Sequence, residues 1–340
     1  RPSLNFWKYP RSKLSMTLDL KHADVTTILH KLLAGADVLV QNLAPGATKK
    51  MGLSYADLES QFPQLIVCNI SGYGDDGPYR SKKAYDLLVQ AEAGFLSVTG
   101  NGDDMVKSGI SIADIAAGTQ AQVAILAALI QRSKTGSGSN IDISMLEAMV
   151  EWMGFPLYYA YDGAQPPART ATDHASIYPY GAFSTGDDKI IMLGIQNERE
   201  WEAFCCDVME QATLISDERF KANTLRSDNR EQLRKIIQQV FAGLTAQQLS
   251  VKLDAAQIAY ANVNDMQAVW QHPQLQALQR IIEVDTPAGS VSGFKPPGNN
   301  SSFEPSLGPV PSVGEHTREI LAELGFDASR IEAFYDSGVV

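Results

Sequence analysis

Two short apolar runs decide the fold class of this chain: Asp37-Val-Leu-Val-Gln-Asn42 and Leu65-Ile-Val-Cys-Asn-Ile-Ser71. The second run is apolar without alternation, as in a strand that is buried on both faces. A helical pattern over 23–33 precedes the first run, a helix over 53–62 separates the two, and an alternating strand at 15–20 comes before them all. The order strand, helix, strand, helix, strand predicts a parallel α/β sheet with right-handed crossovers.

The remaining patterns predict a helical layer and a second domain. They indicate helices over 85–96, 113–132, 146–153, 198–209, 230–241 and 316–324, and strands at 140–144, 178–184 and 190–193. The helix over 113–132 is apolar almost all round and is therefore expected to be central. We expect a Rossmann-like parallel-sheet large domain with a smaller α+β domain, divided as 1–160 (large domain), 173–267 (small domain) and 268–340 (a return segment that completes the large domain).

The composition limits the kinds of partner. The 340 residues carry 28 Lys and Arg against 39 Asp and Glu, a net charge of −11, which disfavours nucleic acid because phosphates require a basic face. No apolar run reaches the ~20 residues of a membrane span. The three cysteines cannot build a disulfide framework, and they suit a reducing compartment. We therefore expect a cytoplasmic protein that binds neither nucleic acid nor membrane.

Several common catalytic patterns are missing from the sequence. The five histidines lack the close spacing of a zinc site, and there is neither a Walker A nor a Gly-x-Gly-x-x-Gly loop. There is no Gly-x-Ser-x-Gly elbow. Cys205-Cys206 lies in a helical stretch without a nearby histidine, so we interpret it as structural. The carboxylates remain as candidates.

Two aspartates lie near predicted helix starts. Asp114 follows Ser111 at the spacing of a capping box, which is the simplest explanation of both residues. Small residues around Asp114 would also leave room for a substrate, and the helix N-terminus would keep its carboxylate ionised and nucleophilic. Asp86 is explained most simply as the N-cap of its own helix. The preceding Lys82-Lys83 is either a solvated pair or an anion clamp.

A series of segments is similar to the class III CoA-transferases, the formyl-CoA transferase and carnitine CoA-transferase-like proteins of the CaiB/BaiF type. They follow the family's order and spacing across nearly the whole chain. The segments are 15–21 (SMTLDLK), 36–46 (ADVLVQNLAPG), 51–53 (MGL), 69–74 (NISGYG), 77–80 (GPYR), 85–91 (YDLLVQA), 108–118 (SGISIADIAAG), 134–136 (KTG), 178–181 (YPYG) and 272–273 (HP).

The resemblance implies a reaction and a nucleophile. Asp114 aligns with the family's nucleophilic aspartate, which would attack an acyl-CoA thioester to form an aspartyl anhydride and then an aspartyl-CoA thioester. An acceptor carboxylate would take the CoA through a second anhydride. Backbone N–H groups near the helix start could stabilise the oxyanions. CoA is a substrate in this scheme, so no cofactor and no metal are expected.

The resemblance also implies a CoA-binding set. Leu18 and Lys21 fall in the family's segment near the nucleotide, and Asn42-Leu43 matches its Asn-Phe pair at a strand end. Lys50 stands where an arginine commonly meets phosphate, and Met51 matches directly. Lys83 and Tyr85 are implied on the pantetheine side.

Two alternatives stay open. The acyl-CoA racemases of the superfamily carry a histidine at the position of Tyr85, and a tyrosine with a pKa near ~10 is poorly suited to proton exchange near neutral pH. A 2-methylacyl-CoA racemase is the first alternative. The second is a truncated, inactive homologue that only dimerises, because the family's first strand–helix–strand, with glutamine and arginine contacts to CoA, does not precede Ser15.

The last expectations concern substrates and assembly. The stretch 173–178 replaces the mobile glycine-rich loop of the formyl-CoA branch, and His174 and Ser176 could receive the distal carboxylate of a dicarboxylic acid such as succinate, itaconate or mesaconate. The implied partners are an acyl-CoA and a carboxylic acid. The family forms interlocked, ring-like homodimers, and the resemblance implies the same here.

Overall fold

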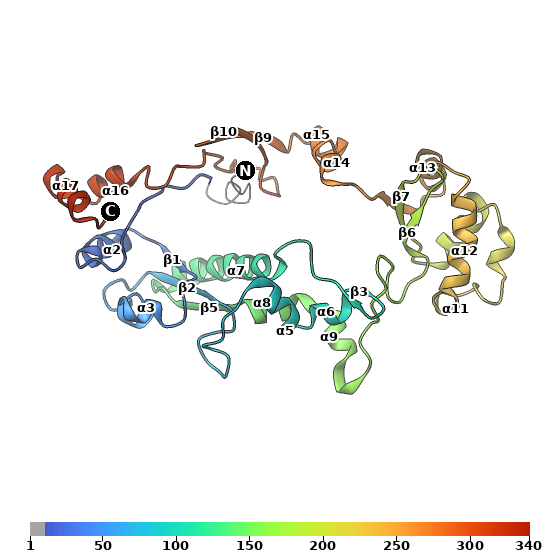
Figure 1. The fold of residues 1–340 in the computed structure, drawn as a ribbon, viewed down its shortest axis with the longest axis horizontal. Helices are drawn as coiled ribbons and strands as arrows, with labels where there is room; N and C mark the ends of the chain where they lie inside the picture. The colour runs from blue at the N-terminus through green and yellow to red at the C-terminus, as the bar shows by residue number, and fades with distance from the viewer. Residues whose placement is uncertain (1–10) are drawn as a thin grey trace. The chain divides into compact units, whose positions relative to one another are not determined.

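The computed structural model describes residues 11–340 (Figure 1), and contacts within the chain divide it into two compact units. The first unit contains residues 11–69 with Val123–Ile141 and Met266–Val340. The second contains Ile70–Gln122 with Asp142–Asp265. Each unit is therefore built from segments that are distant in the sequence. The expected domain limits at 1–160, 173–267 and 268–340 stay predictions.

A three-stranded sheet with the strand order β1-β2-β5 forms the α/β part of the fold. β1 (Val38–Gln41) pairs in parallel with β2 (Ile66–Ser71) along the whole of β1. β5 (Asn140–Ser144) lies on the other side of β2. Because β2 is the middle strand, its first three residues are fully buried. The parallel sheet predicted from the two apolar runs is confirmed.

Short helices lead into the strands of this sheet. α2 (Val25–Ala34) precedes β1 and matches the predicted helix over 23–33 to within two residues. The predicted helix over 53–62 forms only one turn, α4 (Tyr55–Leu58), which follows the equally short α3 (Ala47–Lys50). Leu58 of α4 is buried, so this turn anchors the connection to β2 in the apolar cluster below it.

The predicted strand at 15–20 is wrong. Among the described residues this segment joins no sheet, and its backbone instead hydrogen-bonds the C-terminal segment. The N–H of Asp19 donates to the carbonyl of Val339 at 2.8 Å, and the N–H of His316 donates to the carbonyl of Ser15 at 2.9 Å. A regular ladder does not form because the partner segment turns into helix α16 (Thr317–Glu323).

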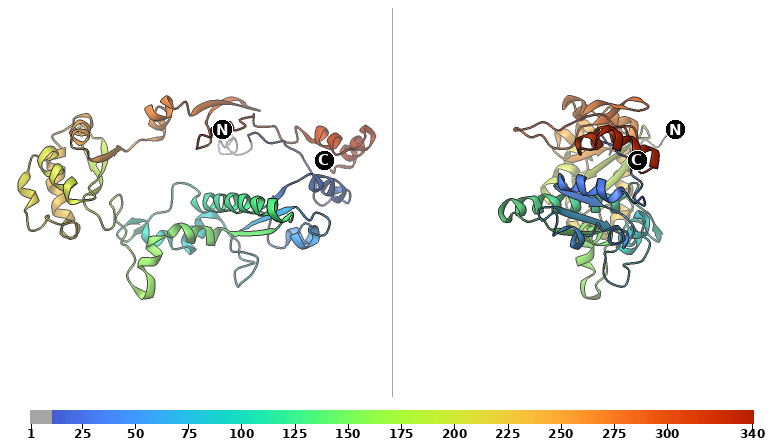
Figure 2. Two further views of the ribbon diagram at one scale, coloured as in Figure 1. Left: turned by 180° about the vertical axis from the view of Figure 1, so that it is seen from behind. Right: turned by 90° about the vertical axis from the view of Figure 1, so that its left-hand side faces the viewer.

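The first described helix packs against the last two, as Figures 1 and 2 show for α2 (blue) beside α16 and α17 (red). Ile28, Leu321 and Phe334 are fully buried in their shared cluster. The sequence analysis missed α17 (Ala328–Ser337), which follows a left-handed glycine and is capped by Asp327. The other elements of this C-terminal part are α14 (Met266–Trp270), α15 (Pro273–Ala277) and the antiparallel hairpin of β9 (Ile281–Thr286) and β10 (Gly289–Phe294).

Helices of the second unit pack tightly around the first half of α7 (Ile112–Thr135). Ala113, Ala116 and Ala117 are buried there, together with residues of α5 (Asp86–Glu92) and α8 (Met145–Met153). The predicted helix over 85–96 is interrupted at Gly94, where φ is 82° and α6 (Phe95–Val98) begins. The short elements nearby are β3 (Gly100–Asn101), β4 (Asp104–Met105), α9 (Phe155–Tyr159) and η1 (Tyr161–Gly163).

α7 leaves much of its apolar surface uncovered in the single chain. Val123, Leu126 and Ile130 are 56%, 52% and 61% exposed. The prediction that this helix is central therefore holds for its first half, whereas its second half is not covered within one chain. Contrary to the sequence estimate, α7 is also long and apolar enough to cross a membrane by length and composition, a test that core helices of water-soluble proteins pass as well.

The second unit contains a module with its own apolar core (Figure 1, yellow-green to orange). Its antiparallel sheet has the order β6-β7-β8, with β6 (Tyr180–Ser184), β7 (Ile190–Gly194) and β8 (Ala259–Asn262). The helices around it are α10 (Glu198–Ala203), the π-turn η2 (Phe204–Val208), the 3-10 turn η3 (Ala212–Ile215), α11 (Asn223–Asp228), α12 (Arg230–Phe241) and α13 (Ala246–Ala255). α12 has the predicted limits.

Candidate active site

Asp86 caps the start of α7, where the exposed Asp114 lies in the first turn. The Oδ1 atom of Asp86 accepts the backbone N–H of Ala113 at 2.7 Å and that of Asp114 at 3.2 Å. The expected capping box is therefore wrong, because the amide that Ser111 would bind is donated to Asp86. The interpretation of Asp86 as the N-cap of its own helix is wrong as well, since Tyr85 holds that position in α5.

Gln90 holds Asp86 in place from one turn further along α5. The side chain of Gln90 is buried, at 1% exposure. Its Nε2 donates to Asp86 Oδ2 at 2.6 Å, and its Oε1 accepts the N–H of Ser108 at 3.0 Å. The sequence analysis missed Gln90. The signal that could have found it is the i, i+4 spacing of Asp86 and Gln90, which places both on one helix face.

Burial raises the pKa of Asp114 above its ordinary value, and the negative charge of Asp86 raises it further. This is the opposite of the expectation that the helix N-terminus keeps the carboxyl group acidic. The loss of solvent around the carboxyl group is the larger cause, and the carboxylate of Asp86, which already occupies the helix N-terminus, adds to it. A more basic carboxylate is the stronger nucleophile once it is ionised.

The amides of the first turn of α7 are already hydrogen-bonded. Those of Ala113 and Asp114 go to Asp86, that of Ile112 donates to the carbonyl of Ile110 at 2.8 Å, and that of Ile115 donates to the carbonyl of Ser111 at 3.0 Å. These four amides are therefore already paired, and the stabilisation of an oxyanion by backbone N–H groups near the helix start stays a prediction.

The small residues near Asp114 serve two different purposes. Ala113, Ala116 and Ala117 are buried and let α7 approach its neighbouring helices closely. A Cβ added at Gly109 or Gly118 would meet no atom within 4 Å. Only the two glycines therefore fit the expectation of open space for a substrate.

Three apolar residues predicted to contact CoA lie in the first unit. Leu18 is half-buried and packs on the cluster of α2, α16 and α17. Leu43 is exposed, and its N–H donates to the Oε1 of Gln41 at 2.7 Å. Met51 is half-buried against the cluster below β1 and β2. Their contact with CoA stays a prediction.

Three polar residues of the predicted CoA set also lie in the first unit and are exposed. Lys21 is in the turn before α2, and Lys50 ends α3. Asn42 follows directly on β1, at the carboxyl end of the strand where ligands of parallel sheets bind. These positions suit contacts to a ligand, and the contacts themselves stay predictions.

Lys82 and Lys83, which follow one another in the loop before α5, have different surroundings. Lys82 is exposed, forms an ion pair with Glu92 and lies 4.2 Å from the centre of the Tyr79 ring, so its charge is already paired within the chain. Lys83 is exposed, and Tyr85 is 72% exposed at the start of α5. Both keep the accessibility that a role beside pantetheine requires.

His174 and Ser176 lie together in the second unit. The Nδ1 atom of His174 accepts the backbone N–H of Ser176 at 3.2 Å and that of Ile177 at 3.1 Å. The ring stacks on Tyr180, with centres 5.3 Å apart. An Nδ1 that accepts two hydrogen bonds leaves the proton of the neutral ring on Nε2. His174 is therefore a fixed Nε2–H donor with a hydroxyl group beside it.

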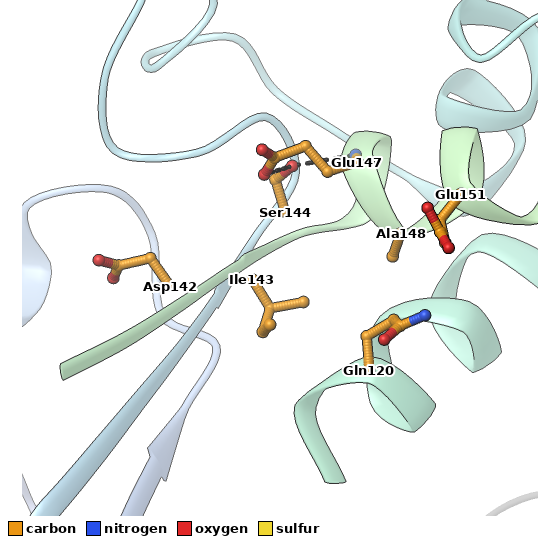
Figure 3. Close-up of a pocket in the computed structure, with 7 residues that line it drawn as sticks. All are labelled: Gln120, Asp142, Ile143, Ser144, Glu147, Ala148 and Glu151. Atoms are coloured by element: carbon orange, nitrogen blue, oxygen red, sulfur yellow. Dashed lines mark hydrogen bonds between the residues drawn. The ribbon is translucent and has the colours of Figure 1, made fainter. Parts of the chain in front are cut away.

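A pocket of about 320 Å³ in the second unit has an acidic lining (Figure 3). Asp142 of β5 and Glu147 and Glu151 of α8 contribute carboxylates, and Gln120 of α7 lies across from them. Glu147 accepts the hydroxyl hydrogen of Ser144 at 2.6 Å. Negative charges repel the phosphates of CoA and the carboxylate of an acid substrate, so this pocket does not suit either of them.

Known proteins resemble this chain along most of its length. The family model described as CoA-transferase family III matches residues 1–317. The chain is 34% identical over 335 residues to the succinyl-CoA:glutarate CoA-transferase of Homo sapiens, covering 97% of this chain and 76% of that protein. It is 28% identical over 340 residues to the succinyl-CoA:mesaconate CoA-transferase of Haloarcula marismortui, covering 96% and 84%. A CAIB/BAIF family protein from Brucella suis has a similar solved structure, with TM-score 0.82, 30% identity, and coverage of 94% of this chain and 83% of that one.

Proposed function

Because the chain belongs to CoA-transferase family III, we propose that it moves CoA from an acyl-CoA donor to a free carboxylic acid with Asp114 as the nucleophile. The observation that carries the proposal is an exposed carboxylate whose backbone is held by Asp86 and whose pKa is raised. Its partners are then small molecules, an acyl-CoA and a carboxylic acid.

The proposed reaction has four acyl-transfer steps, all of which pass through the carboxylate of Asp114. The carboxylate of Asp114 attacks the thioester carbonyl, the C–S bond breaks, and an aspartyl anhydride and CoA thiolate form. The thiolate attacks the aspartyl carbonyl and releases the donor acid as its carboxylate. The acceptor carboxylate then attacks the aspartyl-CoA thioester and frees the thiolate again. Attack of the thiolate on the acyl carbonyl of this second anhydride gives the new acyl-CoA and restores Asp114.

We propose a dicarboxylic acid as the acceptor and succinyl-CoA as the donor. Relatives named for succinyl-CoA with glutarate or mesaconate support this choice. The fixed Nε2–H donor of His174 and the hydroxyl of Ser176 suit the second carboxylate of such an acid. An acid with one carboxylate would leave these polar groups without that partner.

The CoA moiety is proposed to contact the eight residues that the family resemblance assigns to it. The ammonium groups of Lys21 and Lys50 suit the phosphates, because both are exposed, and the exposed Lys83 is proposed on the pantetheine side. Asn42 suits a polar contact at the end of β1, and Leu18, Leu43, Met51 and Tyr85 suit the apolar contacts.

We propose a reducing location such as the cytoplasm. The described cysteines are all free thiols, which supports this proposal.

We also propose that the protein is a homodimer that covers α7. The exposed side chains of Val123, Leu126 and Ile130 support this proposal, since an uncovered apolar stripe of this kind marks an association surface. The interlocked form expected from the family resemblance is the arrangement proposed here.

Mass spectrometry tests the nucleophile. The protein is mixed with succinyl-CoA, digested and searched for CoA or succinyl adducts on the peptide that contains Asp114. We expect an adduct that is lost in Asp114→Ala and kept in Asp207→Ala, a matched exposed aspartate of the small module. No adduct on the wild-type peptide, with α-proton exchange of a 2-methylacyl-CoA in deuterated water, would instead identify a racemase.

Steady-state kinetics test the acceptor. The kcat/KM values for glutarate, succinate and mesaconate are compared with those for butyrate and propionate in wild type and His174→Phe. The Phe ring keeps the stack on Tyr180 and removes the Nε2–H. We expect wild type to prefer dicarboxylates and the variant to lose about tenfold of that preference, the value of one hydrogen bond to a charged group. Equal use of both acid classes by the wild type would contradict the proposal.

A further inference from the structure

We propose that Gln90 is a positioning residue for the nucleophile, which it fixes through Asp86. The inference rests on the proposed role of Asp114 and adds a residue that does not touch the substrate. Gln90 lies on α5, and its side chain is separated from Asp114 by the carboxylate of Asp86.

Four hydrogen bonds connect the segment on both sides of the start of α7. The N–H of Ser108 donates to Gln90 Oε1 at 3.0 Å, and Gln90 Nε2 donates to Asp86 Oδ2 at 2.6 Å. The other oxygen, Asp86 Oδ1, accepts the N–H groups of Ala113 and Asp114 at 2.7 and 3.2 Å. The buried amide of Gln90 and the carboxylate of Asp86 therefore fix the backbone at Ser108, before the nucleophile, and at Asp114 itself.

An amide is the side chain that this position requires. Gln90 accepts a hydrogen bond from Ser108 and donates one to Asp86, and its amide supplies both groups in one orientation without a change of charge. At 1% exposure, water does not replace either bond. A carboxylate at position 90 would face the carboxylate of Asp86 without a hydrogen between them, and Asp86 would turn away from the amides of α7.

The position of Asp114 matters in each step of the proposed reaction, since the same carboxylate forms and breaks two anhydrides and one thioester. A nucleophile that is displaced by about 1 Å loses on the order of a hundredfold in rate. The binding of CoA does not depend on that position. A fault in the Gln90–Asp86 pair should consequently lower kcat and leave KM for the acyl-CoA nearly unchanged.

The proposal is tested by swapping the acid and the amide between positions 86 and 90. In Gln90→Glu the donor to Asp86 is lost, and in Asp86→Asn the new amide nitrogen meets a donor instead of an acceptor. In the double variant D86N/Q90E every bond returns. The amide introduced at position 86 donates to the carboxylate introduced at position 90, and that carboxylate still accepts from Ser108. The amide oxygen at position 86 still accepts from Ala113 and Asp114, and the net charge equals that of the wild type.

The measured quantities are the rate at which the Asp114 peptide gains CoA from succinyl-CoA, kcat and KM. We expect each single variant to lose about tenfold or more in adduct rate and kcat, with KM within about twofold, and the double variant to regain most of the rate. Gln247→Glu, an exposed glutamine on α13, is the matched control and should behave as wild type. Circular dichroism confirms folding, and Gln90→Met, which lacks both polar atoms, replaces Gln90→Glu if that variant does not fold.

The outcomes separate this inference from the proposed function. If the wild-type Asp114 peptide gains no adduct, the proposed function fails first. If it does and Gln90→Glu (or Gln90→Met) matches the wild-type rate, only the role of Gln90 is overturned. A double variant that folds but stays as slow as the single variants also overturns it, because the restored hydrogen bonds would then be irrelevant to the rate.

Discussion

The Oδ1 atom of Asp86 accepts the backbone N–H of Asp114 at 3.2 Å, so one carboxylate both holds the peptide of the candidate nucleophile and raises its pKa. The two effects have opposite consequences for the protein. The hydrogen bonds stabilise the start of α7, whereas two carboxylates at close range repel one another when both are ionised. This compromise is typical of sites where chemistry, and not stability, decides the residue.

Replacement of the nucleophile should stabilise the fold at neutral pH. Burial and the charge of Asp86 raise the folded-state pKa of Asp114 above its ordinary 3.8, so the ionised carboxylate costs stability once the pH exceeds that value. Asp114→Asn removes this cost, and its melting temperature should exceed that of wild type at pH 7. Below pH 3.8 both states are protonated and the gain should vanish. Calorimetry at several pH values measures the difference in melting temperature between the variant and wild type, with Asp207→Asn as the control. A gain that does not change with pH would contradict the explanation.

Gly72, which lies next to the candidate site, should tolerate replacement by alanine only when Ala84 is replaced by glycine at the same time. A Cβ at Gly72 would overlap the Cβ of Ala84, which directly precedes Tyr85 and Asp86. Gly72→Ala should cost about 1–3 kcal/mol of stability, the usual cost of overpacking, and should slow CoA adduct formation on Asp114. Thermal unfolding and the adduct rate measure the two effects.

The double variant G72A/A84G removes the overlap and should regain both stability and rate. Gly35→Ala is the matched control, since its nearest neighbour is the carbonyl oxygen of Leu32 at 3.9 Å. A double variant that is no better than Gly72→Ala would show that the contact with Ala84 is not the cause.

The two partners of the buried ion pair in the small module should differ in their cost. Arg226 is 1% exposed and binds Glu198 through two bonds of 2.8 and 3.0 Å, whereas the Glu198 side chain is 54% exposed. Glu198→Ala leaves the guanidinium its hydrogen bonds to the carbonyls of Tyr178 and Phe220 and should cost about 1–3 kcal/mol. Arg226→Met leaves those two buried carbonyls without their donor as well as Glu198, and should cost more. Urea unfolding ranks the two, and a reversed ranking would contradict this account.

The same pair should give the small module an acid-sensitive component of stability. The hydrogen bonds from Arg226 hold the pKa of Glu198 below its ordinary 4.5. The stabilisation is therefore complete above pH 4.5 and is lost as the pH falls through the lower folded-state pKa. The difference in unfolding free energy between wild type and Glu198→Ala should shrink over that range. A constant difference down to the lowest pH tested would contradict the assignment.

A charge on the exposed stripe of α7 should separate the proposed dimer. Leu126 is 52% exposed in the single chain, and a glutamate there would be an unpaired charge in a covered interface. Light scattering after gel filtration should show Leu126→Glu as a monomer and wild type as a dimer. Val251→Glu, at an equally exposed apolar position of α13, should stay dimeric. A dimeric Leu126→Glu protein would exclude this face of α7 from the interface.

The sequence predicts the parts of the fold whose causes are local. The unbroken apolar run of β2 indicates a strand buried on both faces, and the periodic pattern of α12 predicts both of its ends. Residues 15–20 alternate as a strand should, yet their hydrogen-bond partners lie about 300 positions further on (Ser15 with His316, Asp19 with Val339) and one of them belongs to a helix start. No local pattern contains that information.

The candidate site, like the fold, is predicted from the sequence only in part. Motif order identifies Asp114 as the residue to test. The sequence assigns it the wrong cap, because Asp86 reaches α7 from α5 and the distance between these helices is set by buried alanines. The pKa of Asp114 is raised first by desolvation and then by the charge of Asp86, and both depend on tertiary packing, so the sequence alone predicts the shift with the wrong sign.

The closure of the first unit by its own distant ends has a consequence for biosynthesis. The backbone of Ser12 pairs with Pro309 and that of Asp19 with Val339. A ribosome must therefore make the chain at least as far as residue 339 before this unit can close, while the core around Trp201 and Phe241 can already form on the nascent polypeptide. Until then the apolar side of α2 lacks its contacts with Leu321 and Phe334 and stays exposed to other apolar surfaces.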